Sequence, residues 1–266
     1  MLKNLLIMKK TVCFFLIFIS LIACTTNILD EDKVFDERNV VLNHFFYYND
    51  QVVDTTKIFT LGNARVIFKD VSVAFGGYYF TDHLTDTVVP NFKDTINPYK
   101  FDPNIASLKY GSAARVFKLD NDVYQGVHHF KMGLDSSITP KYSEFDPNHP
   151  MTRDGLYRGE NQGYNSLFIT GLYKEIGDTA SSEPDKIFTY RVSDEILDLW
   201  WTKPTSFNVV SNMDVNMNIV WNIDELLSGL DPTIIDNIES DPSDAVDILL
   251  AESIVNNILA SYQIQL

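Results

Sequence analysis

The sequence predicts a mainly β protein, an antiparallel β-sandwich closed by a C-terminal amphipathic helix. Its aromatic and β-branched runs are short and bounded by Gly, Asn, Asp or Pro, as strands are. The run 215–223 alternates strictly between apolar and mostly polar residues, which is typical of an antiparallel strand with one buried face. Long helices do not separate the strands, so a βαβ architecture is not expected.

The N-terminus predicts export and a lipid anchor. Lys3, Lys9 and Lys10 precede "TVCFFLIFISLIA", an uncharged run that is short for a membrane span, as in a secretory signal. The run ends in "LIAC", so small residues lead into Cys24. This order is that of a bacterial lipoprotein, in which Cys24 takes the lipid after residues 1–23 are removed. The alternative is an ordinary cleavage region or a short membrane anchor with an incidental cysteine. We expect an outer-membrane lipoprotein that faces the periplasm or the cell exterior.

Cysteine content and charge exclude several classes of function. Cys13 leaves with the signal and Cys24 carries the lipid, so the remaining domain has no thiol for a nucleophile, disulfide or metal. The net charge is −15, and removal of three lysines with the signal makes it −15 − 3 = −18. Such an acidic surface repels phosphate backbones, which argues against nucleic-acid binding. Residues 24–39 are rich in Asp and Glu and predict a solvated tether ahead of the domain at 40–266.

The strands of this domain are expected in chain order, each in a run of β-forming residues. They are 40–48, 64–75, 77–82, 114–119, 126–135, 166–173, 186–192, 207–210 and 215–223.

Two helices are expected near the C-terminus. The first is a short turn at 222–229 that ends at Gly229. The second is 241–262, with Asp241 as N-cap and Pro242 at the first helical position. Its apolar stripe toward the domain is expected to consist of Ala245, Ile248, Leu249, Val255, Leu259 and Tyr262.

Four segments together resemble a known family. "YQGVHHFKMGLDSSITPKYSEFDPNHPM", "GLYRGENQGYNSLFITGLY", "KIFTYRV" and "MNIVWNIDELLSG" are similar, in order and spacing, to the MbnP-like domain of bacterial envelope proteins. The resemblance implies a secreted or lipid-anchored β-sandwich. In members of the family, histidines bind copper beside a tryptophan that a dihaem peroxidase-like partner oxidises.

The chain departs from the family at the residues that carry this chemistry. The two family tryptophans fall on Arg158 and Glu160, a family histidine falls on Arg191, and another falls on Phe46. Copper prefers imidazole or thioether ligands, whereas arginine stays protonated and offers no lone pair. We therefore expect no cofactor and no catalysis. Copper stays possible through the resemblance.

Histidines elsewhere in the chain are the weak candidates for a relocated copper site, namely His44, His129 and His149. His44 shares a strand face with apolar neighbours, and His149 lies between two prolines, so packing and capping roles compete with ligation. His128 and His129 are adjacent on one strand and should point to opposite faces.

The loop at 146–164 is the candidate ligand or partner site. It presents Arg153, Tyr157, Arg158, Glu160 and Tyr164, and arginines beside tyrosines can recognise an anion or a partner's acidic edge. The alternative is a solvated turn with local ion pairs. The preferred hypothesis is a lipid-anchored, non-catalytic binding module that holds an envelope partner or a small ligand. The other hypotheses are a copper-binding protein with relocated histidines and a structural accessory subunit of an envelope complex.

Overall fold

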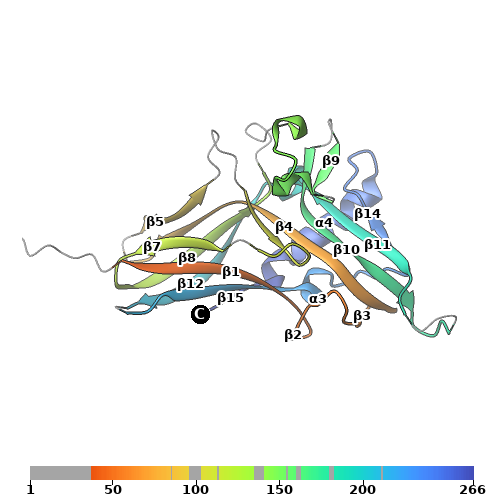
Figure 1. Ribbon diagram of the computed structural model, residues 1–266, viewed down its shortest axis with the longest axis horizontal. Coiled ribbons are helices and arrows are strands. Elements are labelled where there is room, and N and C mark those ends of the chain that lie inside the picture. The colour runs from red at the N-terminus through yellow and green to blue at the C-terminus, as the bar shows by residue number, and fades with distance from the viewer. Residues whose placement is uncertain are drawn as a thin grey trace, which may run out of the picture. The chain divides into compact units, whose positions relative to one another are not determined.

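Two β-sheets face each other in the computed structural model, as Figure 1 shows. The mainly β, sandwich-like fold with a C-terminal helix is confirmed. Residues Arg38–Leu266 form one compact unit. The structure describes residues 37–84, 86–95, 103–112, 114–134, 141–153, 155–159, 163–179, 183–210 and 212–266. Cys24, the expected signal at 1–23 and most of the expected tether lie outside these residues.

The smaller sheet has the order β15-β13-β1-β2, with β7 paired to β1. The alternation expected in 215–223 is confirmed on one face, since Met217, Ile219 and Trp221 are buried, but Val220 on the opposite face is buried as well, at 3% exposed. β1 and β13 run parallel, with Leu42 opposite Met217, so the sandwich is not purely antiparallel. The strands are β1 (Arg38–Tyr48), β2 (Gln51–Val52), β7 (Arg115–Leu119), β13 (Val215–Asn222) and β15 (Tyr262–Gln265).

The larger sheet has the order β12-β8-β4-β10-β11-β14, and β11 and β14 are its parallel pair. Along this path lie β12 (Trp200–Val209), β8 (Asp122–Met132), β4 (Ala64–Asp82), β10 (Gly163–Glu175), β11 (Lys186–Ser193) and β14 (Asn237–Ile238). Shorter strands pair beside it, namely β3 (Phe59–Leu61), β5 (Thr87–Thr95) and β6 (Asn104–Ser107) with β4, and β9 (Tyr157–Gly159) with β10.

β4 is one continuous strand, whereas the sequence suggested two. It pairs with β10 through its first part and with β8 through its second, and the β8 register shifts between Phe75 and Gly77. Gly76 lies at this irregularity, where a Cβ atom would come within 2.3 Å of the Gly133 carbonyl oxygen. Only glycine allows this close approach of two backbones.

The core between the sheets is rich in aromatic rings. The ring centroids of Phe75 and Trp221 lie 5.9 Å apart and those of Phe130 and Tyr262 lie 3.9 Å apart, so each pair joins the two sheets. All four side chains are at most 1% exposed. Burial of each such ring contributes about 1.5–3 kcal/mol or more before the entropy cost of folding.

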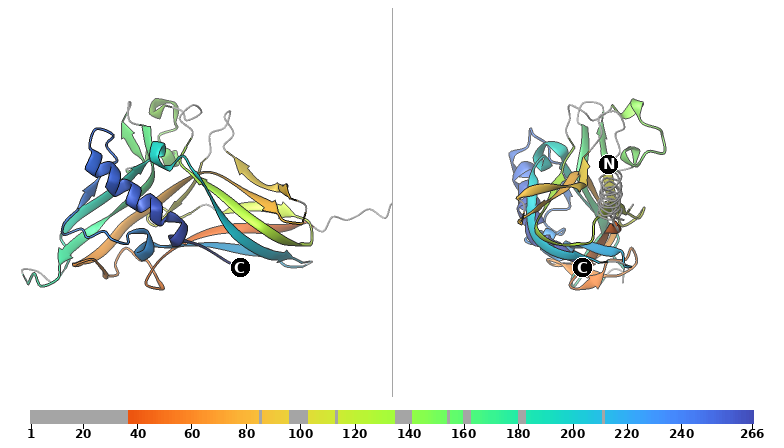
Figure 2. Two further views of the ribbon diagram at one scale, coloured as in Figure 1. Left: turned by 180° about the vertical axis from the view of Figure 1, so that it is seen from behind. Right: turned by 90° about the vertical axis from the view of Figure 1, so that its left-hand side faces the viewer.

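Short helical segments and one longer helix complete the fold. The short ones are η1 (Tyr142–Glu144), η2 (Pro150–Thr152), α2 (Asp194–Leu197) and α3 (Ile223–Leu226). The longer one is α4 (Ala245–Ser261), which lies across the back of the sheets in Figure 2. The expected N-cap Asp241 is wrong. Asp244 accepts hydrogen bonds from the Val246 and Asp247 amides, while Asp241 accepts from Ser243 in a preceding turn.

The expected apolar stripe of this helix is only partly confirmed, because Tyr262 is buried and Val255 packs against the core, whereas other members are not buried. Ala251, Ile254 and Ile258 are fully buried, whereas Leu249 is 63% exposed and Leu259 is 43% exposed. The helix carries apolar residues on more than one face, so its sequence is compatible with two orientations. Packing against α3 and the strands beneath it selects the face that is buried.

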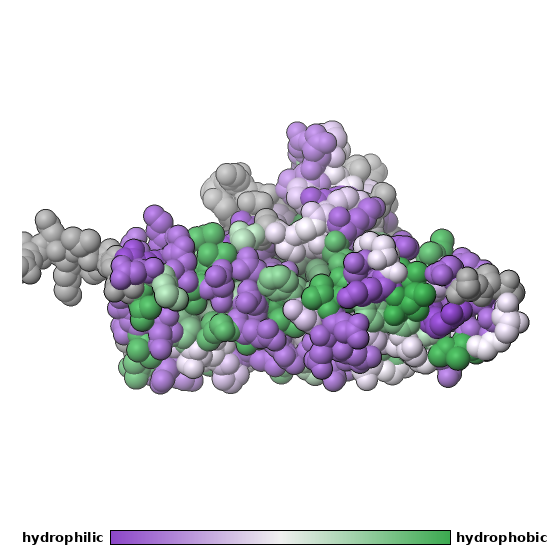
Figure 3. Space-filling model, turned by 60° about the horizontal axis from the view of Figure 1, so that its bottom comes forward, coloured by the Kyte–Doolittle hydropathy of each residue, from purple (hydrophilic) through white to green (hydrophobic). Residues whose placement is uncertain are grey.

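The surface carries no single wide apolar area on the face seen in Figure 3, where hydrophobic residues are scattered among hydrophilic ones. Within the described residues, no helix is both long and apolar enough to cross a bilayer.

Candidate functional site

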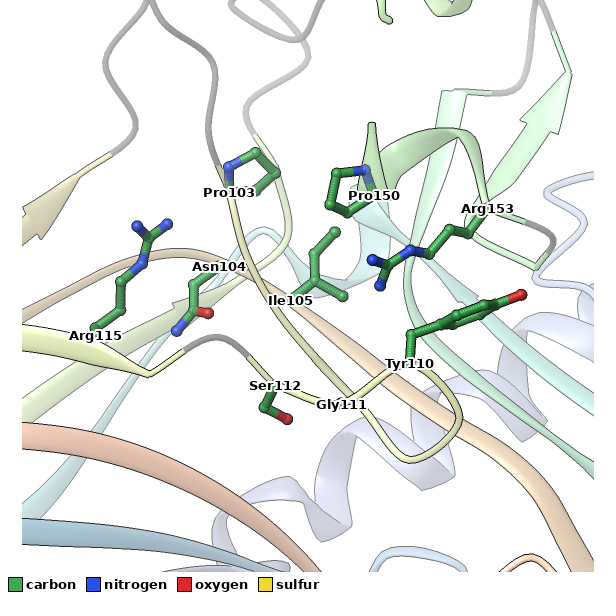
Figure 4. Close-up of a pocket in the computed structure, with 9 residues that line it drawn as sticks. All are labelled: Pro103, Asn104, Ile105, Tyr110, Gly111, Ser112, Arg115, Pro150 and Arg153. Atoms are coloured by element: carbon green, nitrogen blue, oxygen red, sulfur yellow. The ribbon is translucent and has the colours of Figure 1, made fainter. Parts of the chain in front are cut away.

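A cavity of about 360 Å³ opens between β6, the turn that leads from β6 to β7, and η2 (Figure 4). Its volume falls within the range of small-molecule sites, about 300–1,000 Å³. The described lining residues are Pro103, Asn104, Ile105, Tyr110, Gly111, Ser112, Arg115, Pro150 and Arg153. They include two arginines and no carboxylate, in a chain whose net charge is −15.

Arg153 comes from the end of η2 and reaches over the cavity (Figure 4). Its guanidinium carbon lies 4.6 Å from the centroid of the Tyr110 ring, a cation–π contact. Among the described residues, no carboxylate forms an ion pair with Arg153. No carboxylate in the described part of the chain therefore neutralises the Arg153 charge at the mouth of the cavity.

The loop that carries Arg153 is held by local turn chemistry. Asp146 accepts a hydrogen bond from the Asn148 amide at 2.8 Å, and His149 Nδ1 accepts one from the Met151 amide at 3.2 Å. Pro150 occupies the first position of η2, where its missing N–H costs nothing. The expected capping and packing role of His149 is confirmed, because its ring also stacks on Phe145 at 4.5 Å.

Asn104 lies deepest among the polar groups of the cavity. Its side chain is 3% exposed, and one amide atom lies 3.0 Å from Tyr78 Oη. The other, assigned as Oδ1, has no hydrogen-bond partner among the described residues. An unpartnered polar atom at such depth costs about 1–3 kcal/mol, which a suitable ligand would recover.

Arg115 begins β7 on the side of the cavity opposite Arg153 in Figure 4. Its Nε lies 3.0 Å from Asp94 Oδ2, so its charge is paired. Arg115 therefore forms part of the cavity wall and offers N–H donors, but it adds little net positive charge to the cavity.

The turn that carries Tyr110 is anchored by Asp70, a carboxylate only 3% exposed on β4. Asp70 Oδ1 accepts from Ser107 Oγ at 3.0 Å and from the Lys109 amide at 3.1 Å, and Oδ2 accepts from Ser72 Oγ at 2.9 Å. This network fixes the turn and hence the wall of the cavity.

The candidate residues in the loop 146–164 do not form one site. Of the candidates that the structure describes, only Arg153 lines the cavity. Tyr164 is 4% exposed and packs 5.6 Å from Tyr157 in a small second core. Arg158 Nη2 donates to the carbonyl oxygens of Glu239 and Ser240, at 3.2 and 3.3 Å. Glu160 lies outside the described residues.

The described positions that depart from the pattern of the resembled family, Arg158, Arg191 and Phe46, have structural partners. Arg191 forms an ion pair with Glu239 and lies over the Phe168 ring at 5.5 Å. Phe46 is 5% exposed and pairs with Trp221 across β1 and β13.

The candidate metal ligands lie in three different places. His44 is in the core, where Nε2 lies 3.2 Å from Tyr78 Oη. His129 stacks on Tyr79 at 4.1 Å on the outer face of β8, and His149 caps η2. His128 is fully buried while His129 is not, which confirms that the two point to opposite faces. In the described parts of the chain, no three His, Cys, Asp or Glu side chains are placed to share a metal ion.

A buried carboxylate, Asp194, lies at the start of α2 and accepts a hydrogen bond from Ser166 Oγ. Burial raises its pKa to about 7, although the Ser166 bond and the nearby Arg158 charge act in the opposite direction. It contacts core and backbone groups and does not line the cavity.

A second hollow, of about 530 Å³, lies where the ends of β12 and β13 meet. Its described lining includes Met213, Leu266 and several asparagines, and none of these residues has a buried polar atom without a partner. Nothing in this hollow therefore selects a ligand.

Asn104, Tyr110 and Arg115 were not expected from the sequence. They lie far from Arg153 along the chain, and only the pairing of β6 with β4 brings them beside η2. A weak signal existed in the polar turn "KYGSAAR" ahead of β7.

Fold and cavity together define a β-sandwich with a ligand-sized cavity at the edge of its larger sheet. Among solved structures, the chain is similar to MbnP from Methylosinus trichosporium, with a TM-score of 0.49 and 10% sequence identity, over 77% of this chain and 82% of that chain. No protein-family model and no curated protein sequence matches the chain.

Proposed function

We propose that the chain is a non-catalytic binding protein of the bacterial cell envelope, which takes a small ligand into the cavity beside β6. The observation that carries this proposal is the cavity itself. It combines a buried amide atom of Asn104 that has no partner among the described residues with the charge of Arg153, which no described carboxylate pairs. Polar groups in this state gain most from a ligand, because ligand atoms supply the contacts that water or protein would otherwise make.

Binding is favoured over catalysis by the chemistry of the lining. The described lining residues offer guanidinium, amide, phenol and hydroxyl groups, and none of them is an imidazole, thiol or carboxylate. General acid–base catalysis near neutral pH depends mainly on those three groups.

The proposal is tested by a thermal-shift screen of a small-molecule library against the full-length protein in mild detergent. We expect ligands that raise the melting temperature of the wild type and not that of Arg153→Gln. Arg65→Gln is the matched control, because Arg65 lies on β4 and does not line the cavity. A library without any stabilising compound, or hits that bind both variants equally, would count against the cavity.

The location belongs to the same proposal and rests on the N-terminal sequence. Cys24 carries the lipid, and the acidic segment after it separates the domain from the outer membrane. Labelling cells with an alkyne fatty acid should mark the wild type and not Cys24→Ser. Protease treatment of intact cells then distinguishes a surface-facing domain from a periplasmic one. The order of segments that resembles the MbnP-like family agrees with this location.

A second candidate function is an accessory subunit of an envelope complex. It is favoured by β12, which among the described strands pairs only with β8 and exposes Trp200 by 44%. An open edge strand can accept a strand from a partner. Crosslinking in membranes followed by pull-down tests this function, and recovery of a dihaem peroxidase-like chain would restore the redox partnership of the family.

A further inference from the structure

The ligand class of the cavity follows from the hydrogen bonds behind Asn104. Four buried side chains lie in series. Trp221 Nε1 lies 3.5 Å from His44 Nδ1, His44 Nε2 lies 3.2 Å from Tyr78 Oη, and Tyr78 Oη lies 3.0 Å from the Asn104 amide. None of the four is more than 7% exposed.

The donor and acceptor roles in this series of hydrogen bonds are fixed by Trp221, at the end farthest from the cavity. An indole N–H can only donate, so His44 Nδ1 accepts. Burial lowers the pKa of His44 to about 3, so the ring is neutral and its proton resides on Nε2. His44 therefore donates to Tyr78 Oη, and the phenol must pass its own proton onward.

Asn104 is the remaining neighbour of this phenol. With the amide nitrogen toward Tyr78, Oη receives two donors and its proton has no acceptor among the described residues. Rotating the amide by 180° removes the conflict without moving another group. Oδ1 then accepts from Tyr78, and the NH₂ group faces the cavity.

The described lining of the cavity then includes several hydrogen-bond donors. Arg153 adds a charged guanidinium, and the Ser112 hydroxyl can donate because its oxygen already accepts from the Ser107 amide at 3.3 Å. A guanidinium fork matches the oxygens of a carboxylate. Ile105, Pro103 and Pro150 line the same cavity and would cover a hydrocarbon part, which an inorganic anion lacks.

We infer that the cavity selects small organic carboxylates, with Arg153 bound to the carboxylate and the Asn104 amide donating to it. This inference rests on the proposed function, because it names the ligand class of the same cavity. Trp221, His44 and Tyr78 are positioning residues that hold the Asn104 amide in the donating orientation.

The test uses matched pairs of an acid and its neutral analogue, measured by calorimetry on the full-length protein. One pair is galacturonic acid and galactose. The other is N-acetyl-alanyl-alanine with a free and with an amidated C-terminus, so that the two pairs distinguish a sugar acid from a peptide end. We expect at least one acid to bind about tenfold or more tightly than its neutral partner, and Arg153→Gln to abolish the preference.

Tyr78→Phe is the decisive variant. It removes the acceptor and donor that orient Asn104 while leaving every lining residue in place. We expect it to lower the ratio of acid to neutral affinity several-fold, which a merely structural role would not do, because lost stability weakens both ligands alike. Arg65→Gln should leave the ratio unchanged.

The outcomes distinguish a failure of the proposed binding function from a failure of the proposed ligand class. If the thermal-shift screen finds only neutral or cationic ligands in the cavity, or if neither acid is preferred, the carboxylate inference is overturned and the binding function stands. If no compound binds, both are overturned. An unchanged ratio in Tyr78→Phe removes the positioning role.

Discussion

His128 Nε2 and Tyr262 Oη lie 3.0 Å apart in the core, and this contact joins β8 of the larger sheet to β15 of the smaller one. His128 Nδ1 has no other partner among the described residues. Tyr262→Phe therefore leaves the imidazole without a hydrogen bond. We expect the free energy of unfolding to fall by about 1–3 kcal/mol, measured by urea denaturation. Tyr47→Phe, at a half-buried tyrosine on β1, should change it by less than about 0.5 kcal/mol.

The two buried imidazoles predict acid sensitivity. Burial lowers the pKa values of His44 and His128 to about 3, whereas an unfolded histidine titrates near 6.5. Between these values the unfolded chain binds more protons, so stability falls as the pH drops from 6.5 toward 3. At pH 5 each buried imidazole should lower the free energy of unfolding by on the order of 2 kcal/mol, relative to its value above pH 6.5.

Imidazole NMR resonances provide the direct measurement. In the folded protein those of His44 and His128 should not titrate above pH 4. A midpoint near 6 for either buried ring would contradict the pKa assignment.

Asp194 predicts the opposite pH dependence. Burial raises its pKa to about 7, so the folded state favours the protonated carboxyl and stability is lost as the pH rises from about 4 through 7. Asp194→Asn keeps a neutral side chain at all pH values. Its free energy of unfolding, relative to that of the wild type, should rise by on the order of 2–3 kcal/mol between pH 5 and pH 8. Denaturation curves at both pH values test this, and a constant difference would show that Asp194 stays ionised.

Variants of Arg158 and Arg153 should distinguish a role in stability from a role in ligand binding. Arg158 donates to two backbone carbonyls beyond β14, so Arg158→Ala should reduce stability by about 1–2 kcal/mol and leave ligand affinity unchanged. Arg153→Ala should abolish binding with little loss of stability, because its visible contact is the exposed ring of Tyr110. Melting temperatures and calorimetry on both variants test the contrast. The reverse pattern would move the site from the cavity to the loop around Arg158.

Copper binding by relocated histidines is a further hypothesis from the sequence that can be tested. His44 has both ring nitrogens in hydrogen bonds, His149 uses Nδ1 as a cap, and His129 contacts Thr81 at 3.1 Å on another face. We therefore expect protein from copper-supplemented cultures to retain no stoichiometric copper after dialysis, measured by mass spectrometry. One equivalent of copper that is lost in His44→Gln or His149→Gln would establish the relocated-ligand hypothesis instead.

Strands with clear alternation were predictable because their pattern encodes one buried face. β1 and β13 follow this rule closely. The first part of β12 was missed because an edge strand has little need of apolar alternation and tolerates Pro204 in mid-strand. The polar segments that form β5 and β6 were also missed, since their strand conformation depends on β4 beside them.

The start of α4 shows the limit of local signals. Asp241 and Asp244 are both plausible caps, and the sequence around each offers backbone amides at the right distance along the chain. The loop 146–164 is a similar case. Its charged and phenolic residues were found, but one lines the cavity and others are structural.

The sequence by itself determined the class of fold and the opposite orientations of His128 and His129, because alternation acts over a few residues. Only the tertiary structure decided that Arg153 meets Asn104 and Tyr110 at one cavity, and that Trp221, His44 and Tyr78 lie behind it. These contacts join strands far apart in the chain, and strand pairing and core packing set them, which no local pattern of residues records.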